Sequence, residues 1–183
     1  MSHTIKKALL GCLEIPLFMK TGVKRFENTK EAAISSFMVP FLFLFPISEI
    51  SRINPDYADL SYIYILSMTA LLLALSMIFY YGACYACMVA LDRKNHIYQF
   101  ISATNWITLT SFVTNMPFFL LVYWGYYSYQ EMFNLFIFMT FFAVTYQAFM
   151  ITHLLRINWM LGAAISILSL LIDDGLRQII FPE

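Results

Sequence analysis

Residues 60–91 read LSYIYILSMTALLLALSMIFYYGACYACMVAL and contain no Asp, Glu, Lys or Arg. A helix needs about 20 mainly apolar residues to cross the hydrocarbon core of a membrane, so this run is long enough to cross with tilt. Inside hydrocarbon every backbone N–H and C=O needs a partner, which only helices and closed barrels provide. The run is continuously apolar, whereas a barrel strand alternates, and we therefore predict a membrane-spanning helix.

The composition of the whole chain agrees with a membrane protein. Of its 183 residues, 61% are hydrophobic and 12% are charged, and the mean hydropathy is +0.71. A soluble domain has about 25% charged residues, so this chain lacks the side chains that a water-facing surface requires. The formal net charge is zero, which gives no support to a nucleic-acid partner, and lipid is the expected solvent.

Four further apolar runs complete an all-α bundle of five transmembrane helices. The predicted spans, within a membrane domain of residues 32–183, are residues 32–48, 60–91, 97–122, 132–155 and 157–180. The first span is short and contains Pro40 and Pro46, so we expect a kinked helix there, with a re-entrant helix as the alternative.

The N-terminal segment, residues 1–31, is basic and is expected to lie in the cytoplasm and at the membrane surface. Within it we predict a short amphipathic helix over residues 5–17, which Pro16 should end. Its apolar face is expected to carry four side chains, those of Ile5, Leu9, Cys12 and Leu13.

The distribution of basic residues predicts the orientation of the spans. All of the eleven Lys and Arg residues except Arg52 and Arg177 fall on the side of the N-terminal segment. The positive-inside rule places that side in the cytoplasm, so the N-terminus is predicted inside and the C-terminus outside. Residues 123–129 are rich in Tyr and include Trp124, and such rings favour the headgroup boundary at the outer end.

Polar side chains follow one face of the third predicted span. Thr104, Thr108, Ser111 and Asn115 recur at spacings of four, three and four, and Asn105 lies beside them. We interpret this stripe as hydrogen bonding between helices, which is its ordinary role in membranes. A solute path is the alternative interpretation.

The last predicted span carries small and polar residues on one face, and that face ends at Asp173. Arg177 follows Asp173 by four residues, a spacing that favours an ion pair near the outer boundary of the membrane. A proton or cation site at Asp173 is the alternative, because acids inside membranes are often functional.

The sequence offers little that predicts catalysis. The three cysteines are Cys12, Cys84 and Cys87, and the last two form a CxxC without the soluble context of a redox motif. We therefore identify no catalytic, cofactor-binding or metal-binding residue, and we expect that the protein is not an enzyme. A membrane enzyme acting on lipid, or a metal site in the Cys and His residues, is a weaker alternative.

Three stretches resemble an uncharacterised family of alphaproteobacterial inner-membrane proteins. They are ALLGCLEIPLFMKTGVKRFENTKEAAISSFMVPFLFLFP (8–46), FISATNWITLTSF (100–112) and YQAFMITHLL (146–155). The resemblance implies a multi-pass protein of the bacterial inner membrane. The chain is more loosely similar to the Yip family of five-span membrane proteins, whose N-terminus is also cytoplasmic.

These observations favour a non-enzymatic scaffold or accessory subunit in the membrane. Its expected partners are membrane lipids and other membrane proteins. The alternative is a small transporter or channel component that uses the polar face of the third span and Asp173.

Overall fold

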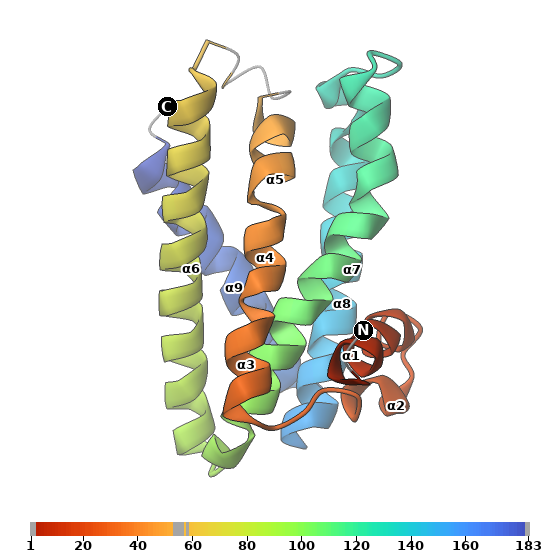
Figure 1. Cartoon of the computed structure of the whole chain (residues 1–183), viewed down its shortest axis with the longest axis vertical. Helices are drawn as coiled ribbons and strands as arrows, with labels where there is room; N and C mark the ends of the chain where they lie inside the picture. The colour runs from red at the N-terminus through yellow and green to blue at the C-terminus, as the bar shows by residue number, and fades with distance from the viewer. Residues whose placement is uncertain (1–2, 53–56, 58, 182–183) are drawn as a thin grey trace.

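The computed structural model describes residues 3–52, 57 and 59–181, and the described residues are α-helical with short connections and no strand. Figure 1 shows the helices, most of which run along one axis. They are α1 (His3–Glu14), α2 (Lys20–Val23), α3 (Lys30–Ser36), α4 (Met38–Leu42), α5 (Leu44–Ser51), α6 (Tyr62–Ala90), the 3-10 turn η2 (Lys94–His96), α7 (Ile97–Tyr123), α8 (Tyr129–Leu155) and α9 (Trp159–Ile180).

Five helical segments within the described residues are long and apolar enough to cross a membrane. Their bounds are Lys30–Ser51, Tyr62–Ala90, Lys94–Tyr123, Tyr129–Leu155 and Trp159–Ile180. The expected five-span helical fold is therefore confirmed. The side of the membrane on which each terminus lies stays a prediction.

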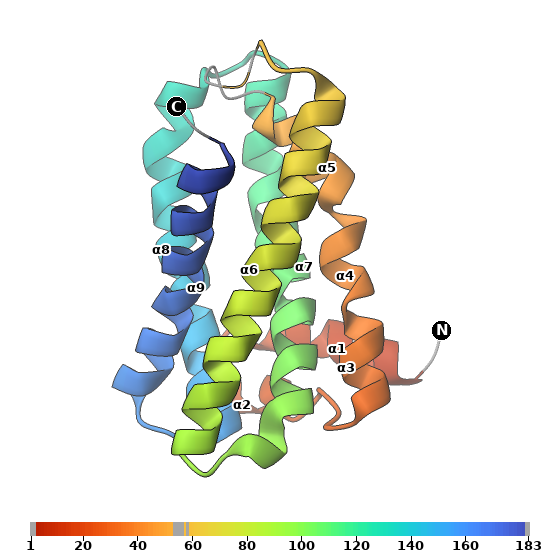
Figure 2. The same ribbon diagram turned by 90° about the vertical axis from the view of Figure 1, so that its left-hand side faces the viewer.

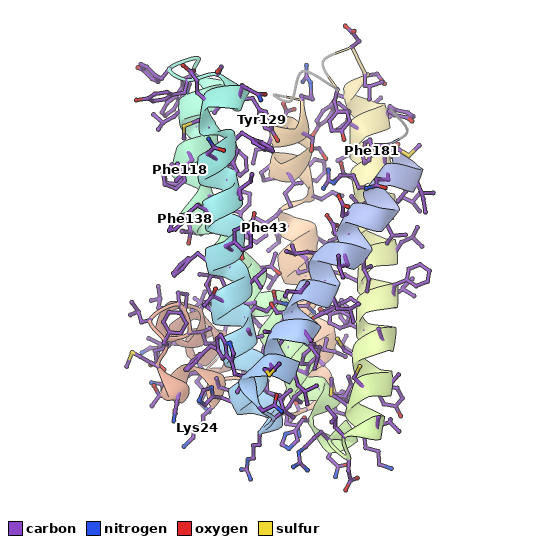
Figure 3. All side chains as sticks on the ribbon, turned by 180° about the vertical axis from the view of Figure 1, so that it is seen from behind. Lys24, Phe43, Phe118, Tyr129, Phe138 and Phe181 are labelled. Atoms are coloured by element: carbon purple, nitrogen blue, oxygen red, sulfur yellow. The ribbon has the colours of Figure 1, made fainter. Side chains whose placement is uncertain are left out.

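The five spans form a closed ring (Figures 1 and 2). α3 and α4 pack on α7, α7 packs on α8, α8 on α9, α9 on α6, and α6 on α5. One end of the ring carries α2, η2 and the turn between α8 and α9, and we name it the basic end. The other end carries the loop between α7 and α8, and we name it the aromatic end. Figure 3 shows Lys24 at the basic end, and Tyr129 and Phe181 at the aromatic end.

The buried core lies mainly in the half of the ring next to the basic end. It joins the N-terminal segment to the end of α6, the start of α7, the end of α8 and the start of α9. Its largest fully buried members include Ile15, Met88, Phe100, Tyr146 and Met150. Core burial therefore fastens the N-terminal segment to helices that are distant in sequence.

Two prolines break the first span into α3, α4 and α5. Pro40 and Pro46 have no N–H to donate to the carbonyl four residues earlier. The helix is interrupted three residues before each proline, at Phe37 and Phe43, whose N–H groups bond to the carbonyls three residues back at 3.3 and 3.2 Å. The pieces nevertheless follow one another along the length of the bundle (Figure 1), so the span is broken and is not re-entrant.

The N-terminal helix α1 lies across the bundle near the basic end and packs on α7 (Figure 2). It buries Ala8 and Cys12, and Ile15 directly after the helix is also buried, whereas Leu13 is 67% exposed and Ile5 is 38% exposed. Of the predicted apolar face, Cys12 packs into the bundle and Leu13 is exposed. The position of this helix at the membrane surface stays a prediction. Small side chains allow α1 to approach α7 closely, and the bulky Leu13 is left on the outer side.

Candidate functional site: buried polar contacts and a pocket at the basic end

Asn105 on α7 connects three spans. Its Nδ2 donates to Ser36 Oγ of α3 at 2.9 Å, and its Oδ1 accepts from the Tyr81 hydroxyl of α6 at 2.6 Å. The Asn105 side chain is 1% exposed, and an unpaired amide at this depth would carry a large desolvation cost. Asn105, which the sequence placed only beside the polar stripe, is thus the residue that joins these helices.

The polar stripe of α7 is not continuous. Only Ser111 reaches another helix, through a hydrogen bond with the Tyr146 hydroxyl of α8. Thr108 donates to the Thr104 carbonyl at 3.2 Å, and Asn115 donates to the Ser111 carbonyl at 2.8 Å. The Thr104 hydroxyl is buried without a partner among the described residues.

A second polar face of α7, which the sequence analysis missed, holds α1. The Thr110 hydroxyl donates to the Cys12 carbonyl at 2.8 Å, and the Cys12 thiol donates to the Trp106 carbonyl at 3.1 Å. Burial raises the pKa of the Cys12 thiol to about 12, so the thiol keeps the proton that it donates. The four-residue spacing of Trp106 and Thr110 is the signal that places both on one helical face.

The small residues of α9 serve close packing against α8. A Cβ atom on Gly162 would lie 2.1 Å from Thr152 Oγ1 and 2.9 Å from the Ala148 carbonyl oxygen. One turn further, the Ser166 hydroxyl donates to the Val144 carbonyl at 3.0 Å. Small residues at such crossings let two backbones approach, which is the packing interpretation of this face.

Asp173 pairs with Arg177 and also reaches α6. Its Oδ2 lies 3.4 Å from Arg177 Nη2, and its Oδ1 accepts from the Ser76 hydroxyl at 3.2 Å. The side chains of Asp173 and Arg177 are 44% and 43% exposed. The neighbouring Asp174 accepts from Gln178 of the same helix at 3.0 Å. Asp173 therefore links α9 to α6, a contact that its spacing from Arg177 did not predict.

A pocket of about 460 Å³ lies at the basic end, between α1, the segment before α3, α3 itself, α4 and α7. This volume is within the range of small-molecule sites. Its buried apolar lining includes Ala8, Ala32 and Val39. Charged and hydroxyl side chains line the same pocket, among them Arg25, Glu31 and Ser102.

Two ion pairs hold the segment before α3, which lines part of this pocket. Arg25 donates through Nε and Nη2 to the two carboxylate oxygens of Glu14, at 3.3 and 2.6 Å. This pairing lowers the pKa of Glu14 and raises the pKa of Arg25. Lys7 lies 3.7 Å from Glu27. The Gln99 side chain of α7 donates to the Phe26 carbonyl at 3.0 Å, which fixes the segment to the bundle.

The Cys and His side chains form no candidate metal centre in the described part of the chain. No three His, Cys, Asp or Glu residues come together there in a metal-binding group. All three cysteines are free thiols, with Cys12 and Cys84 buried and Cys87 half-buried.

The chain was compared with protein-family models, curated proteins and solved structures. No family model, no curated protein and no solved structure matches it significantly. The resemblance to alphaproteobacterial inner-membrane proteins and the likeness to the Yip family therefore stay predictions.

Proposed function

We propose that this chain is a non-enzymatic scaffold or accessory subunit in the bacterial inner membrane, which acts through contacts with other membrane proteins and lipids. The observation that carries this proposal is the use of the polar residues within the spans. Asn105 and Ser111 bond to neighbouring helices, and Thr108 and Asn115 bond to their own backbone. The contacts of Asn105 and Ser111 join helices of the bundle, as polar residues ordinarily do in membranes.

The outer face of α6 suits contact with another membrane helix. Gly82, Ala86 and Ala90 recur every fourth residue and are exposed, and a Cβ on Gly82 would meet nothing within 4 Å. Exposed Ile78 and Tyr85 flank them, at 66% and 49% exposure. A four-residue repeat of small residues permits close approach of a second helix. This face supports the scaffold proposal and is the place to test it.

The experiment is site-specific photo-cross-linking in membranes, with the cross-linker placed at exposed position 85. We expect a discrete protein adduct that Gly82→Leu abolishes, since a branched side chain would hold the second helix away. Gly175→Leu is the matched control, because Gly175 on α9 also has open space around it. Adducts with lipid alone, or an adduct that Gly82→Leu leaves unchanged, would contradict the scaffold proposal.

A small transporter or channel component is the second candidate, and one contact favours it. Asp173 and Ser76 place a carboxylate and a hydroxyl between α9 and α6, both within the candidate spans. Ionisable groups at such positions can bind protons or cations. Substitution of Asp173, described in the Discussion, separates this candidate from the scaffold.

A further inference from the structure

The pocket at the basic end changes in polarity along its length. Glu31 of α3 lines it nearest the basic end, and Met38 and Leu42 of α4 line it further into the span. At 1.5 Å per helical residue, the distance from Glu31 to Leu42 is about 16 Å. The pocket therefore runs from charged groups to hydrocarbon side chains along the same direction as the bundle.

Hydroxyl groups lie between these two regions. Ser102 of α7 is 3% exposed and lines the pocket, and its hydroxyl makes no hydrogen bond to another described residue. The Ser35 hydroxyl of α3 also lines the pocket and donates only to its own helix, to the Ala32 carbonyl at 3.1 Å. The Ser102 hydroxyl therefore remains available to donate to an acceptor bound in the pocket.

The part of the pocket that α4 lines opens toward the outer, lipid-facing side of the bundle. Met38 and Leu42 are each 65% exposed, whereas Val39 between them is buried at 5% exposure. In a membrane-spanning helix the exposed side chains of α4 face lipid. An acyl chain can therefore enter from the bilayer and lie on Val39 without passing through the protein.

The charged rim carries both signs. Arg25 uses Nε and Nη2 for Glu14, which leaves Nη1 of its guanidinium available for an anionic oxygen. Glu31 is exposed and makes no ion pair or hydrogen bond with another described residue. A guanidinium is suited to phosphate, and an unpaired carboxylate is suited to a cation that donates hydrogen bonds.

We propose that this pocket binds one phospholipid whose headgroup carries a primary ammonium, with its phosphate at Arg25 and its ammonium at Glu31. The order of groups in such a lipid is headgroup, ester and acyl chain, and it matches the order of charges, hydroxyls and hydrocarbon in the pocket. The ester oxygens accept from Ser102, and one acyl chain lies along α4. This site is separate from the α6 face and does not rest on the scaffold role.

Trp106 lines the pocket and provides a direct probe of the acyl chain. The chain has three tryptophans, so Trp124→Phe and Trp159→Phe leave Trp106 as the only one. The full chain in detergent is titrated with phosphatidylethanolamine or phosphatidylglycerol that carries brominated acyl chains. We expect saturable quenching at one lipid per protein, with phosphatidylethanolamine roughly threefold to fivefold tighter, as for one partly exposed charge pair. Quenching that does not saturate, or that is equal for both lipids, would overturn the proposal.

Two pairs of variants locate the lipid. Ser35→Phe fills the pocket and should abolish saturable quenching, whereas Ile34→Phe, one residue away and 59% exposed, should not. Glu31→Gln should remove the preference for phosphatidylethanolamine, and Lys30→Gln should keep it. Both Glu31 and Lys30 are exposed, so neither change threatens the fold.

These variants also exclude a different occupant. If Ser35→Phe and Ile34→Phe weaken quenching equally, the quencher is lipid around the bundle and the pocket is not a site. A photo-cross-linker at position 35 should capture lipid. Capture of a protein there would show that a partner segment fills the pocket, and the lipid proposal would fail.

Discussion

The Asn105 side chain and the Ser36 hydroxyl share a 2.9 Å hydrogen bond between residues that are 69 positions apart in the chain. Both are almost fully buried, at 1% and 0% exposure. Because Ser36 is the last residue of α3, the bond fixes the first span immediately before its break at Phe37. The same amide accepts from Tyr81, so one side chain positions the first three spans.

Substitution of Asn105 by Leu should destabilise the bundle. The change removes two interhelical hydrogen bonds and leaves the half-buried Tyr81 hydroxyl without its partner, at a cost of about 1–3 kcal/mol. Thermal unfolding in detergent measures the loss. Asn115→Leu is the matched control, because Asn115 bonds only to its own helix, and its effect should be smaller. Equal effects of the two variants would refute the importance of the Asn105 contacts.

The crossing of α8 and α9 should not accept a larger residue at Gly162. Gly162→Ala places a Cβ against Thr152 Oγ1 and the Ala148 carbonyl, and the forced separation should cost about 1–3 kcal/mol. Gly175→Ala, in open space, should be neutral or slightly stabilising, since Ala is the better helix former. Thr152→Ala should restore part of the lost stability to Gly162→Ala. Thermal unfolding of Gly162→Ala, Gly175→Ala and the double variant with Thr152→Ala tests this. An unchanged stability of Gly162→Ala would show that the two helices are not closely packed at this crossing.

The substitution Asp173→Asn distinguishes the scaffold proposal from the transporter proposal. An exposed ion pair contributes about 0–1 kcal/mol, and Asn can still accept from Ser76, so expression and thermal stability should hardly change. A growth or transport phenotype of Asp173→Asn at normal protein level would put transport ahead of scaffolding. Asp174→Asn is the control, because Asp174 bonds only to Gln178.

The attachment of α1 should depend on pH through Glu14. The Arg25 guanidinium lowers the pKa of Glu14 below its usual 4.5. The folded state therefore gains stability above pH 4.5, and this gain is lost as the pH falls through the lowered pKa. Protease cleavage near residue 17 should rise in that acidic range. Glu14→Gln should cleave more readily at neutral pH and show a smaller dependence on pH.

The orientation of the chain in the membrane can be determined by cysteine labelling in intact cells. In a cysteine-free background, Tyr127→Cys at the aromatic end should react with an impermeant reagent without permeabilisation. Lys24→Cys at the basic end should react only after permeabilisation. The reverse pattern would invert the predicted topology.

The spans could be predicted from the sequence because lipid forces a continuous apolar helix for each crossing. The role of Asn105 could not, because its partners Ser36 and Tyr81 come from other spans, and the rotation of each helix follows from packing. The burial of Cys12 beside the exposed Leu13 could not be predicted for a related reason. Periodicity grouped Leu13 with Cys12, but it did not reveal that α7 packs on the Cys12 side of α1.

The pocket could not be predicted from the sequence because its walls come from five segments that are brought together only in the folded chain. By contrast, the pairing of Asp173 with Arg177 could be foreseen, since both lie on one helix at a four-residue spacing. Local contacts are thus within reach of sequence reasoning here, whereas the partner residue of a contact between spans is not.

The attachment of α1 to α7 fixes an order of assembly. Cys12 and Thr110 are 98 residues apart, so the surface that receives α1 does not exist until the third span has been synthesised. α1 precedes the spans in the chain, so it is synthesised before its docking surface and must wait at the membrane while three spans enter the bilayer. The docking of α1 on α7 and of α2 on α8 requires that these later helices are in place, so a segment that is synthesised before the spans is secured only after them.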